Sequence, residues 1–327
     1  MRAILVRQHG GPEVLKLEDM PDPQPRDGEV LVRVRAAGVN PVDGYIRSGA
    51  HARKAAPPYV PGLDGAGEVV AAGRGVNRFA AGDRVYFGGD GGKPAGAGTY
   101  AELAVAGPAH LHPLPDGISF AQGAALGVPY ATAYRALFQR GGARPSETVF
   151  VHGATGGVGI AAVQFARAHG MTIVASGGTG EGLAVIREHG ADVVVNHRTD
   201  GYAEAVMRAT SGRGVDLIVE MAAHLNLDRD LRLLARRGRV VVVGSRGAVE
   251  ITPRDAMGRD ADIRGLMLFN ATDDDLAEIH AAIVAGLRNR TLKPVVSREM
   301  PLGEAARAHE AVMEPGARGK IVLVTDR

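Results

Sequence analysis

The fold class is indicated by the stretch Val149–Gly159, which reads Val-Phe-Val-His-Gly-Ala-Thr-Gly-Gly-Val-Gly. A short β-branched and aromatic run ends at Val151, and apolar residues at helical spacing begin at Val158. This order predicts a strand, a glycine-rich turn and a helix. In such a unit Gly156 would let the backbone approach a pyrophosphate, and Gly159 would let the helix pack closely on the strand. The phosphates would lie at the positive end of the helix.

The glycine turn alone is weak evidence for a ligand, because Ala154 replaces the first glycine of the usual dinucleotide fingerprint. The alternative is a glycine-rich turn that binds nothing. The strand before the turn, the helix after it and the β/α units further along the chain favour a dinucleotide site.

The composition is that of an ordinary globular protein, and 327 residues suggest about two domains. The net charge of +2, from 38 basic and 36 acidic residues, does not argue for a polyanionic partner. Because the chain has no Cys, disulfides and thiolate metal sites are excluded. No signal-peptide core and no long apolar run are present, so we expect a soluble cytoplasmic protein.

The first part of the chain, from Met1 to about Pro115, has an all-β pattern that suggests a compact barrel-like domain. Asp90–Gly98 contains four glycines and one proline and is interpreted as a mobile loop. The strands expected here are Ala3–Arg7, Val14–Leu17, Glu29–Ala36, Glu68–Ala72, Arg84–Phe87 and Tyr100–Val105.

After a helical segment, Phe120–Gln139, strands and helices alternate as far as Phe269. Six strands with crossover helices predict a doubly wound parallel sheet, so the fold class is α/β. The expected strands are Thr148–Val151, Thr172–Ala175, Asp192–Asn196, Asp216–Glu220, Arg239–Val243 and Ile263–Leu268. The expected helices are Gly157–His169, Glu181–His189, Tyr202–Thr210 and Asp228–Ala235.

The last part of the chain begins with a long amphipathic helix, Asp274–Arg290. A segment at Lys293–Val296, a helix around Glu304–Met313 and a strand at Lys320–Val324 follow, and these do not extend the alternation. We therefore expect the tail to return to the first domain. The expected domains are a catalytic domain of residues 1–122 and 291–327 and a dinucleotide-binding domain of residues 123–290.

Taken together, several segments resemble the medium-chain dehydrogenase/reductase superfamily, and more narrowly its zinc-free zeta-crystallin family of NADPH:quinone oxidoreductases. The superfamily resemblance is carried by the glycine turn with Gly38–Asp43, Pro61–Gly67 and Gly82–Val85, and the narrower one by Tyr45–Gly49, Val243–Gly247 and Pro253–Asp255. The similarity covers nearly the whole chain. It implies a GroES-like β-rich domain plus a Rossmann domain, NADPH as cofactor, a quinone as substrate, and a homodimer or homotetramer.

The alcohol dehydrogenases of this superfamily bind a catalytic zinc, and the resemblance allows that site to be checked. Asn40 stands where they carry the first Cys, and Leu63 stands where the His of their Gly-His-Glu motif falls. Zinc needs three or four converging nitrogen, sulfur or oxygen ligands. We therefore expect no metal.

The sequence after the second Rossmann strand favours NADPH over NADH. NAD sites usually place an acid about 20 residues after the glycine turn, but here Ser176–Thr179 contains no carboxylate. His197 and Arg198, or Lys320 from the tail, could supply positive charge for a 2′-phosphate. For Arg198 and Lys320 the alternative is a solvated surface cation.

The resemblance also implies a set of residues that touch the cofactor. They are Tyr45, Thr155, Gly156, Gly157, Val158, Gly178, His197, Asn226, Val243, Gly244, Ser245, Arg246, Leu266, Met267 and Leu268. Val243–Ser245 also fits on physical grounds, because it ends a buried strand at the edge where doubly wound sheets bind ligands.

Near the reacting atoms we expect Asn40, Tyr45 and Thr132, each able to donate a hydrogen bond to the oxygen of the acceptor. For Asn40 and Thr132 a purely structural turn or helix contact is the alternative. Related enzymes tend to carry a tyrosine shortly after Ser-Gly in this loop, whereas here His51 follows Ser48-Gly49-Ala50. His51 could deliver a proton to the reduced product, or it could be an exposed loop residue.

Two other functions remain open. A 2-alkenal or enoyl-thioester reductase would use the same fold and NADPH. Such an enzyme needs a well-placed proton donor, and the tyrosine that related enzymes carry after Ser-Gly is missing here. Binding of AU-rich RNA, or a structural crystallin-like role, is suggested only by the resemblance. Aromatic residues are 4% of the chain, and the densest basic cluster, Arg232–Arg239, is interpreted as a solvated helix end. The possible sheet edge Ile263–Leu268 predicts self-association.

Overall fold

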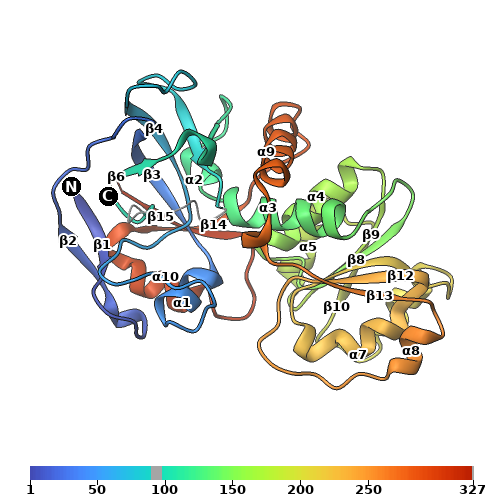
Figure 1. The fold of residues 1–327 in the computed structure, drawn as a ribbon. Helices are drawn as coiled ribbons and strands as arrows, with labels where there is room; N and C mark the ends of the chain where they lie inside the picture. Colours follow the sequence, from blue (N-terminus) through green and yellow to red (C-terminus); the bar gives the residue numbers. More distant parts are fainter. Residues whose placement is uncertain (90–97, 326–327) are drawn as a thin grey trace. The chain divides into compact units, whose positions relative to one another are not determined.

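The chain forms two compact units in the computed structural model, which describes all residues except 90–97 and 326–327 (Figure 1). Unit 1 comprises Met1–Ala131, Leu276–Asn289 and Pro294–Arg327. Unit 2 comprises Thr132–Asp275 and Arg290–Lys293. The loop interpreted as mobile from the sequence lies, apart from Gly98, outside the described residues.

Unit 1 is built on an antiparallel pair, β1 and β2, and a mixed seven-stranded sheet. The sheet has the order β14-β15-β3-β4-β5-β7, and β6 also pairs with β3. The long strand β3 is buried except at Arg33 and Arg35, and its valines at positions 30, 32 and 34 belong to the core at the spacing of one strand face. The strands are β1 (Arg2–Val6), β2 (Leu15–Asp19), β3 (Val30–Val39), β4 (Asp64–Ala72), β5 (Arg84–Phe87), β6 (Leu103–Ala106), β7 (Leu111–Pro113), β14 (Val296–Pro301) and β15 (Lys320–Val324).

The all-β prediction for the first part of the chain is wrong at helix α1 (Pro41–Arg47). This helix forms because Asn40 and Asp43 make a capping box and Pro41 occupies the first helical position. Strand β7 was also missed. The helical segment expected over Phe120–Gln139 is observed as α2 (Phe120–Gly123), α3 (Gly127–Tyr134) and a π-helical stretch η3 (Arg135–Arg140). Short 3₁₀ turns are η1 (Pro12–Val14), η2 (Pro108–His110) and η5 (Leu302–Glu304).

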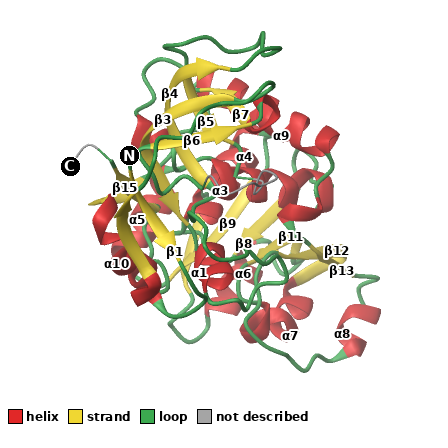
Figure 2. Cartoon of the chain, turned by 60° about the vertical axis from the view of Figure 1, so that its left-hand side comes forward, coloured by secondary structure: helices red, strands yellow, loops and turns green. Residues whose placement is uncertain are grey.

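Unit 2 is a six-stranded parallel sheet with the order β10-β9-β8-β11-β12-β13, which confirms the predicted α/β fold class. The strands are β8 (Thr148–Val151), β9 (Thr172–Gly177), β10 (Val193–Asn196), β11 (Val215–Glu220), β12 (Leu234–Val242) and β13 (Asp262–Gly265). Helices cover both faces of this sheet (Figure 2). They are α4 (Gly157–Ala168), α5 (Gly180–Glu188), α6 (Tyr202–Ala209), α7 (Ala223–Leu233) and α8 (Pro253–Met257).

The strand order of unit 2 reverses between β8 and β11. From β8 the chain moves outward through α4 and α5 to β10, and then α6 returns it to β11 on the other side of β8. Doubly wound sheets bind their ligands at such a switch point, outside the carboxyl ends of the strands. The glycine turn follows β8 and therefore lies at this position.

Three predicted boundaries in unit 2 are wrong. Helix α7 begins at Ala223, not at Asp228, and β12 begins at Leu234, inside the segment expected to be helical. Strand β13 ends at Gly265, and Leu268 belongs to a 3₁₀ turn, η4 (Leu268–Asn270). None of the described helices combines the length and the apolar character that crossing a membrane requires.

The tail returns to unit 1, where β15 pairs antiparallel with β3 and α10 (Ala305–Ala311) contacts η1. The long helix α9 (Asp273–Arg288) also belongs to unit 1 from Leu276 onward, whereas the expected boundary at residue 290 placed it with the dinucleotide-binding domain. The reason is its buried face: His280 of α9 stacks on His112 of β7, with ring centroids 3.7 Å apart.

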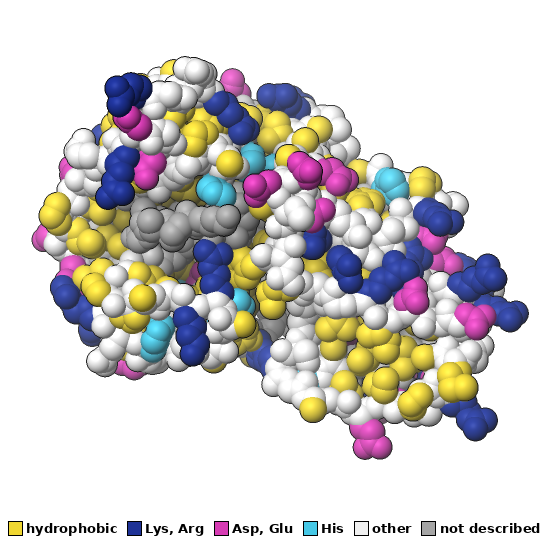
Figure 3. All heavy atoms as spheres, viewed as in Figure 1, with side chains coloured by type: hydrophobic (Ala, Val, Ile, Leu, Met, Phe, Trp, Pro, Cys, Tyr) yellow, Lys and Arg dark blue, Asp and Glu magenta, His cyan; other side chains and the backbone are white. Residues whose placement is uncertain are grey.

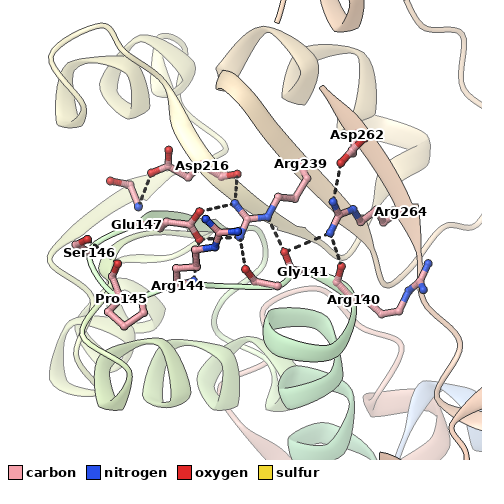
Figure 4. A network of polar contacts seen from close by, with 12 residues as sticks. Arg140, Gly141, Arg144, Pro145, Ser146, Glu147, Asp216, Arg239, Asp262 and Arg264 are labelled. Carbon is pink, nitrogen blue, oxygen red and sulfur yellow. Dashed lines mark hydrogen bonds and ion pairs between the residues drawn. The ribbon is translucent and has the colours of Figure 1, made fainter. Parts of the chain in front are cut away.

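A polar network links several segments of the chain at the amino-terminal edge of the parallel sheet (Figure 4). Arg239 of β12 makes two parallel hydrogen bonds to Glu147, at 2.9 and 2.7 Å, and donates at 2.6 Å to the carbonyl of Gly141. Arg239 is buried, so the interpretation of the whole Arg232–Arg239 cluster as a solvated helix end is wrong for this residue. The network leaves its guanidinium unavailable to a nucleic acid.

Candidate active site

The glycine turn after β8 has the shape of a phosphate cradle. Gly153 has φ of +55°, a value that favours glycine, and Gly156 is the N-cap of α4. A Cβ at Gly159 would lie 2.7 Å from the backbone carbon of Ala154, so only glycine allows the helix to approach the turn. A Cβ at Gly156 would meet nothing nearer than 4.0 Å. Space is therefore open over Gly156, where an anion would meet the positive end of α4.

Thr155 connects this turn to the beginning of α5. Its side chain is buried, and a Cβ at Gly182 would lie 2.7 Å from its Cγ2. Because Thr155 packs beside Gly182, the glycine turn and the segment after β9 are held in contact with each other.

Positive charge lies at the carboxyl ends of β9 and β10. A Cβ at Gly178 would lie 2.8 Å from Nε of Arg198 and 3.0 Å from Nε2 of His197, so the three residues are in close contact. Burial lowers the pKa of His197, with smaller contributions from His152 and Arg198, and the imidazole stays neutral at pH 7. The positive charge beside Gly178 therefore comes from Arg198.

The predicted residues after β11, β12 and β13 also lie along this edge of the sheet. The amides of Val243 and Gly244 donate to the carbonyl of Glu220 at 2.8 and 3.2 Å, and Asn226 Nδ2 donates to its carboxylate at 3.2 Å. The amide of Leu266 donates to the carbonyl of Val242 at 3.0 Å. Farther along these loops follow Ser245, Arg246, the exposed Met267 and the buried Leu268.

In unit 1, Asn40 is hydrogen-bonded to both members of a buried ion pair, Lys320 and Asp64. Lys320 Nζ donates at 2.8 Å to Asp64 Oδ2 and also to Asn40 Oδ1, while Asn40 Nδ2 donates to Asp64 Oδ2 at 2.9 Å. The expectations for Lys320 are corrected, because its ammonium is neither solvated nor free for a 2′-phosphate but neutralises Asp64. Sequence reasoning did not identify Asp64 as a site residue; the available signal was a carboxylate between the small and apolar residues Leu63 and Gly65–Gly67.

A second buried network holds helix α1, which carries Tyr45. Asp43 accepts a hydrogen bond from the amide of Asn40 at 2.8 Å, and Tyr100 Oη lies 3.1 Å from His309 Nε2. Because Arg47 donates to His309 Nδ1, that nitrogen accepts and Nε2 carries the hydrogen. Burial, and then the charge of Asp64, raises the pKa of Asp43 to about 7.

The remaining predicted catalytic residues lie in different units. Tyr45 is half-buried on α1, and its carbonyl accepts a hydrogen bond from the amide of His51 at 3.1 Å, so α1 and the following loop bring these two residues together. His51 Nδ1 lies 3.0 Å from the amide nitrogen and 3.3 Å from the carbonyl oxygen of Arg53, and the tautomer of the ring decides which of the two it bonds. Thr132 is buried in α3 and is the first residue of unit 2.

The matches to known proteins agree with this architecture. Residues 26–116 match the alcohol dehydrogenase GroES-like domain, and residues 157–285 match the zinc-binding dehydrogenase domain. The chain is 45% identical over 326 residues to a human quinone oxidoreductase, which covers 99% of this chain and 98% of the relative. Its fold superposes on an NAD-dependent alcohol dehydrogenase with a TM-score of 0.91, at 33% identity and coverage of 99% and 100%. An Escherichia coli quinone oxidoreductase complexed with NADPH gives a TM-score of 0.87, at 29% identity and the same coverage.

The two domain matches define a medium-chain dehydrogenase/reductase of the alcohol dehydrogenase superfamily. Within this class, the sequence identity to quinone oxidoreductases over the full length of the chain shows the family. The chain belongs to the quinone oxidoreductase family.

The name of the second domain raises the question of zinc, and the residues present do not fit it. Leu63 offers no ligand atom, and the amide oxygen of Asn40 accepts from Lys320. The carboxylate of Asp64 is paired with the same ammonium and also accepts from the amide of Val128 at 2.7 Å. A tetrahedral site with three protein ligands cannot be assembled from this set.

Proposed function

We propose that this protein is an NADPH-dependent quinone reductase that acts without a bound metal. The observation that carries the proposal is the open cradle over Gly156 at the switch point of the parallel sheet, with Arg198 beside Gly178 at the same edge. The human and Escherichia coli relatives named quinone oxidoreductases, the latter complexed with NADPH, support the same activity.

Arg198 supports the choice of NADPH over NADH. No acidic residue precedes Glu181 after β9, so a 2′-phosphate would meet the guanidinium of Arg198 and no carboxylate from Ser176–Thr179. An acid at this position would instead accept hydrogen bonds from a ribose hydroxyl. Comparable catalytic efficiency with NADPH and NADH would contradict this assignment.

When bound, the dinucleotide supplies the hydride, and the chain has to hold it and stabilise charge on the acceptor oxygen. Gly156, Gly157 and the first turn of α4 would bind the pyrophosphate. Tyr45 would donate a hydrogen bond to the oxygen of the quinone, and α1 is fixed for this task by the Asp43 network. Because a quinone is already electrophilic, this donor is sufficient and no Lewis acid is required.

His51 is a candidate for the proton that completes reduction. Its Nδ1 lies 3.0 Å from the amide nitrogen and 3.3 Å from the carbonyl oxygen of Arg53, and these contacts hold the ring in its loop. If the H51A variant keeps both the turnover and the pH profile of the parent protein, water supplies the proton and His51 has only a local role.

The activity is tested by NADPH oxidation with ortho-quinones, para-quinones and 2-alkenals under identical conditions, with chelator present. We expect turnover with quinones and little with alkenals. Faster turnover with alkenals or enoyl thioesters would assign the chain to the alternative reductase, and absence of NADPH oxidation would overturn the proposal.

We also propose that β13 pairs two copies of the chain. It lies at the end of the parallel sheet and pairs only with β12 among the described strands. Ile263 and Met267 are each 43% exposed, and hydrophobic side chains gather around this part of unit 2 (Figure 3). Within β13 itself Ile263 stands between the charged Asp262 and Arg264. A sheet edge is a template for pairing with a second edge, and exposed apolar side chains on and beside it favour burial between two copies.

A further inference from the structure

Three titratable side chains are buried together at the carboxyl ends of β8 and β11. His152 Nε2 lies 2.8 Å from Asp230 Oδ1 and 3.3 Å from Glu220 Oε2. The exposure of the three side chains is 4%, 0% and 0% for His152, Asp230 and Glu220. The hydride chemistry proposed above uses none of them.

The contacts require this cluster to hold a proton beyond the one on the neutral imidazole. Both neighbours of His152 Nε2 are carboxyl oxygens, so this nitrogen carries its hydrogen and donates it. Two carboxylates buried side by side cannot both ionise without a large cost. An oxygen of Glu220 and one of Asp230 lie within 4.8 Å of each other, and the two carboxyl groups are hydrogen-bonded, which requires a proton on one of them.

The titration of the cluster falls near neutrality. Burial raises the pKa of Glu220 to about 7. The charge of His152 lowers this pKa, and the charge of Asp230 raises it further. Burial raises the pKa of Asp230 to about 7 as well, and burial lowers the pKa of His152. The other groups that face the cluster are Arg229 of α7, whose Nη1 donates to Tyr202 of α6 at 2.6 Å, and His197 after β10.

Glu220 is the member of the cluster that organises the neighbouring loops. Its carboxylate accepts hydrogen bonds from the amide of Ala222 and from Asn226 Nδ2, at the start of α7. Its carbonyl accepts from Val243 and Gly244, after β12. Through His152 it also contacts the glycine turn. Three separate segments proposed to touch the dinucleotide therefore depend on one buried side chain and its backbone.

We propose that Glu220 is a positioning residue for the dinucleotide, and that the proton it shares with Asp230 keeps the glycine turn, the start of α7 and the loop after β12 in their binding arrangement. This inference rests on the proposed function. Loss of the proton places two negative charges against each other in the cluster, so the affinity for NADPH falls as the pH rises through about 7.

The test compares the parent protein with E220Q and E220A. Glutamine keeps the acceptor oxygen for Ala222 and Asn226, and its amide hydrogens replace the shared proton toward Asp230. We therefore expect E220Q to bind NADPH as the parent does at pH 6, and with little change up to pH 8.5. The parent should lose roughly tenfold in affinity over that range, as release of one proton allows. E220A should bind roughly tenfold more weakly at every pH and raise KM for NADPH more than it lowers kcat.

The measurements are fluorescence titrations with NADPH. They are repeated with NADH, which has no 2′-phosphate, so that the ionisation of the 2′-phosphate does not contribute to the pH dependence. D230N is the second variant, since it should flatten the pH dependence while retaining the fold. If E220Q keeps the pH slope of the parent, or if E220A binds with unchanged affinity, the inference is overturned. Stoichiometric metal in the parent that is lost from E220Q would also overturn it, by assigning the cluster to a cation.

The inference and the proposed function fail in different ways. A parent protein that binds no NADPH contradicts both. A parent protein that binds NADPH and reduces quinones, but whose pH dependence is unaffected by E220Q and D230N, contradicts the inference alone.

Discussion

Lys320 Nζ and Asp64 Oδ2 lie 2.8 Å apart in unit 1, with 5% and 0% of their side chains exposed. Lys320 begins β15 and Asp64 begins β4, and both strands flank β3, whose end carries Asn40. The pair therefore closes the end of β3 and joins two segments that are 256 residues apart in sequence. It also engages the amide of Asn40, the position at which the resemblance places the first zinc-binding Cys of the alcohol dehydrogenases.

Replacing Lys320 with Met should be strongly destabilising, because it leaves the Asp64 carboxylate buried without its partner. We expect K320M to lose about 3–5 kcal/mol in the free energy of unfolding, measured by urea denaturation. The matched control is R74A, which removes an ion pair to Asp27 whose side chains are 86% and 64% exposed. That change should cost less than about 1 kcal/mol. Equal losses in the two variants would mean that the buried pair has no special role.

Two glycines of the turn should respond differently to alanine. At Gly156 a Cβ has open space, so G156A should fold normally and weaken NADPH binding by roughly tenfold or more, since the methyl group occupies the cradle. At Gly159 the Cβ would lie 2.8 Å from the carbonyl of Gly153, so G159A should lower the melting temperature without any ligand. Thermal unfolding and NADPH titration of both variants separate the effects. Unchanged affinity in G156A would argue against phosphate binding at this turn.

Arg198 should decide between the two nicotinamide cofactors. R198Q removes the positive charge beside Gly178, so KM for NADPH should rise roughly tenfold, as expected for a lost charge-assisted contact, while KM for NADH stays constant. R208Q, which alters an exposed arginine of α6, serves as the control. If R198Q raises both KM values equally, Arg198 supports the loop and does not recognise the 2′-phosphate.

The edge of β13 that pairs with no described strand should hold two copies together. We expect a dimer or a larger even-numbered assembly in light scattering at micromolar concentration, and we expect I263K to shift it toward the monomer because a charge is placed on the pairing edge. L17K is the control, since Leu17 is also exposed, at 41%, but lies in unit 1. A monomeric parent protein, or equal effects of both substitutions, would contradict pairing through β13.

Asp43 should make stability depend on pH. Its pKa is about 7 in the folded chain, above its ordinary value of 3.8, so the folded state binds more protons between these values and stability falls as the pH rises from about 4 to 7. D43N keeps an acceptor for the amide of Asn40 and removes the titration. Relative to D43N, the parent protein should lose about 1–3 kcal/mol across this window in thermal or urea unfolding. Parallel curves for the two proteins would show that Asp43 ionises normally.

Local patterns were sufficient to predict the sheet of unit 2. Strand β8 was predicted with its observed bounds, because a β-branched run stops abruptly at Gly153 and helical spacing begins after Gly156. Helix α1 was missed, since seven residues are too few to establish an apolar period. Its start was nevertheless encoded by Asn40, Pro41 and Asp43, which form a capping signal.

Contacts between distant segments could not be predicted. Nothing near Lys320 in sequence indicates Asp64, and pairing them requires the register of β15, β3 and β4. The cluster of His152, Glu220 and Asp230 comes from three different segments, and two of its members looked like ordinary polar residues at the ends of strands. Burial changes their chemistry, and burial follows from the tertiary fold.

We propose that the chain passes electrons from NADPH to a quinone without a metal ion. The most direct test is steady-state NADPH oxidation with a para-quinone, using protein dialysed against a strong chelator and the same protein after addition of zinc. We predict equal turnover in both samples. Loss of turnover on chelation with recovery on addition of zinc would show that the enzyme needs a metal, and no NADPH oxidation in either sample would show that it is not an NADPH-dependent quinone reductase.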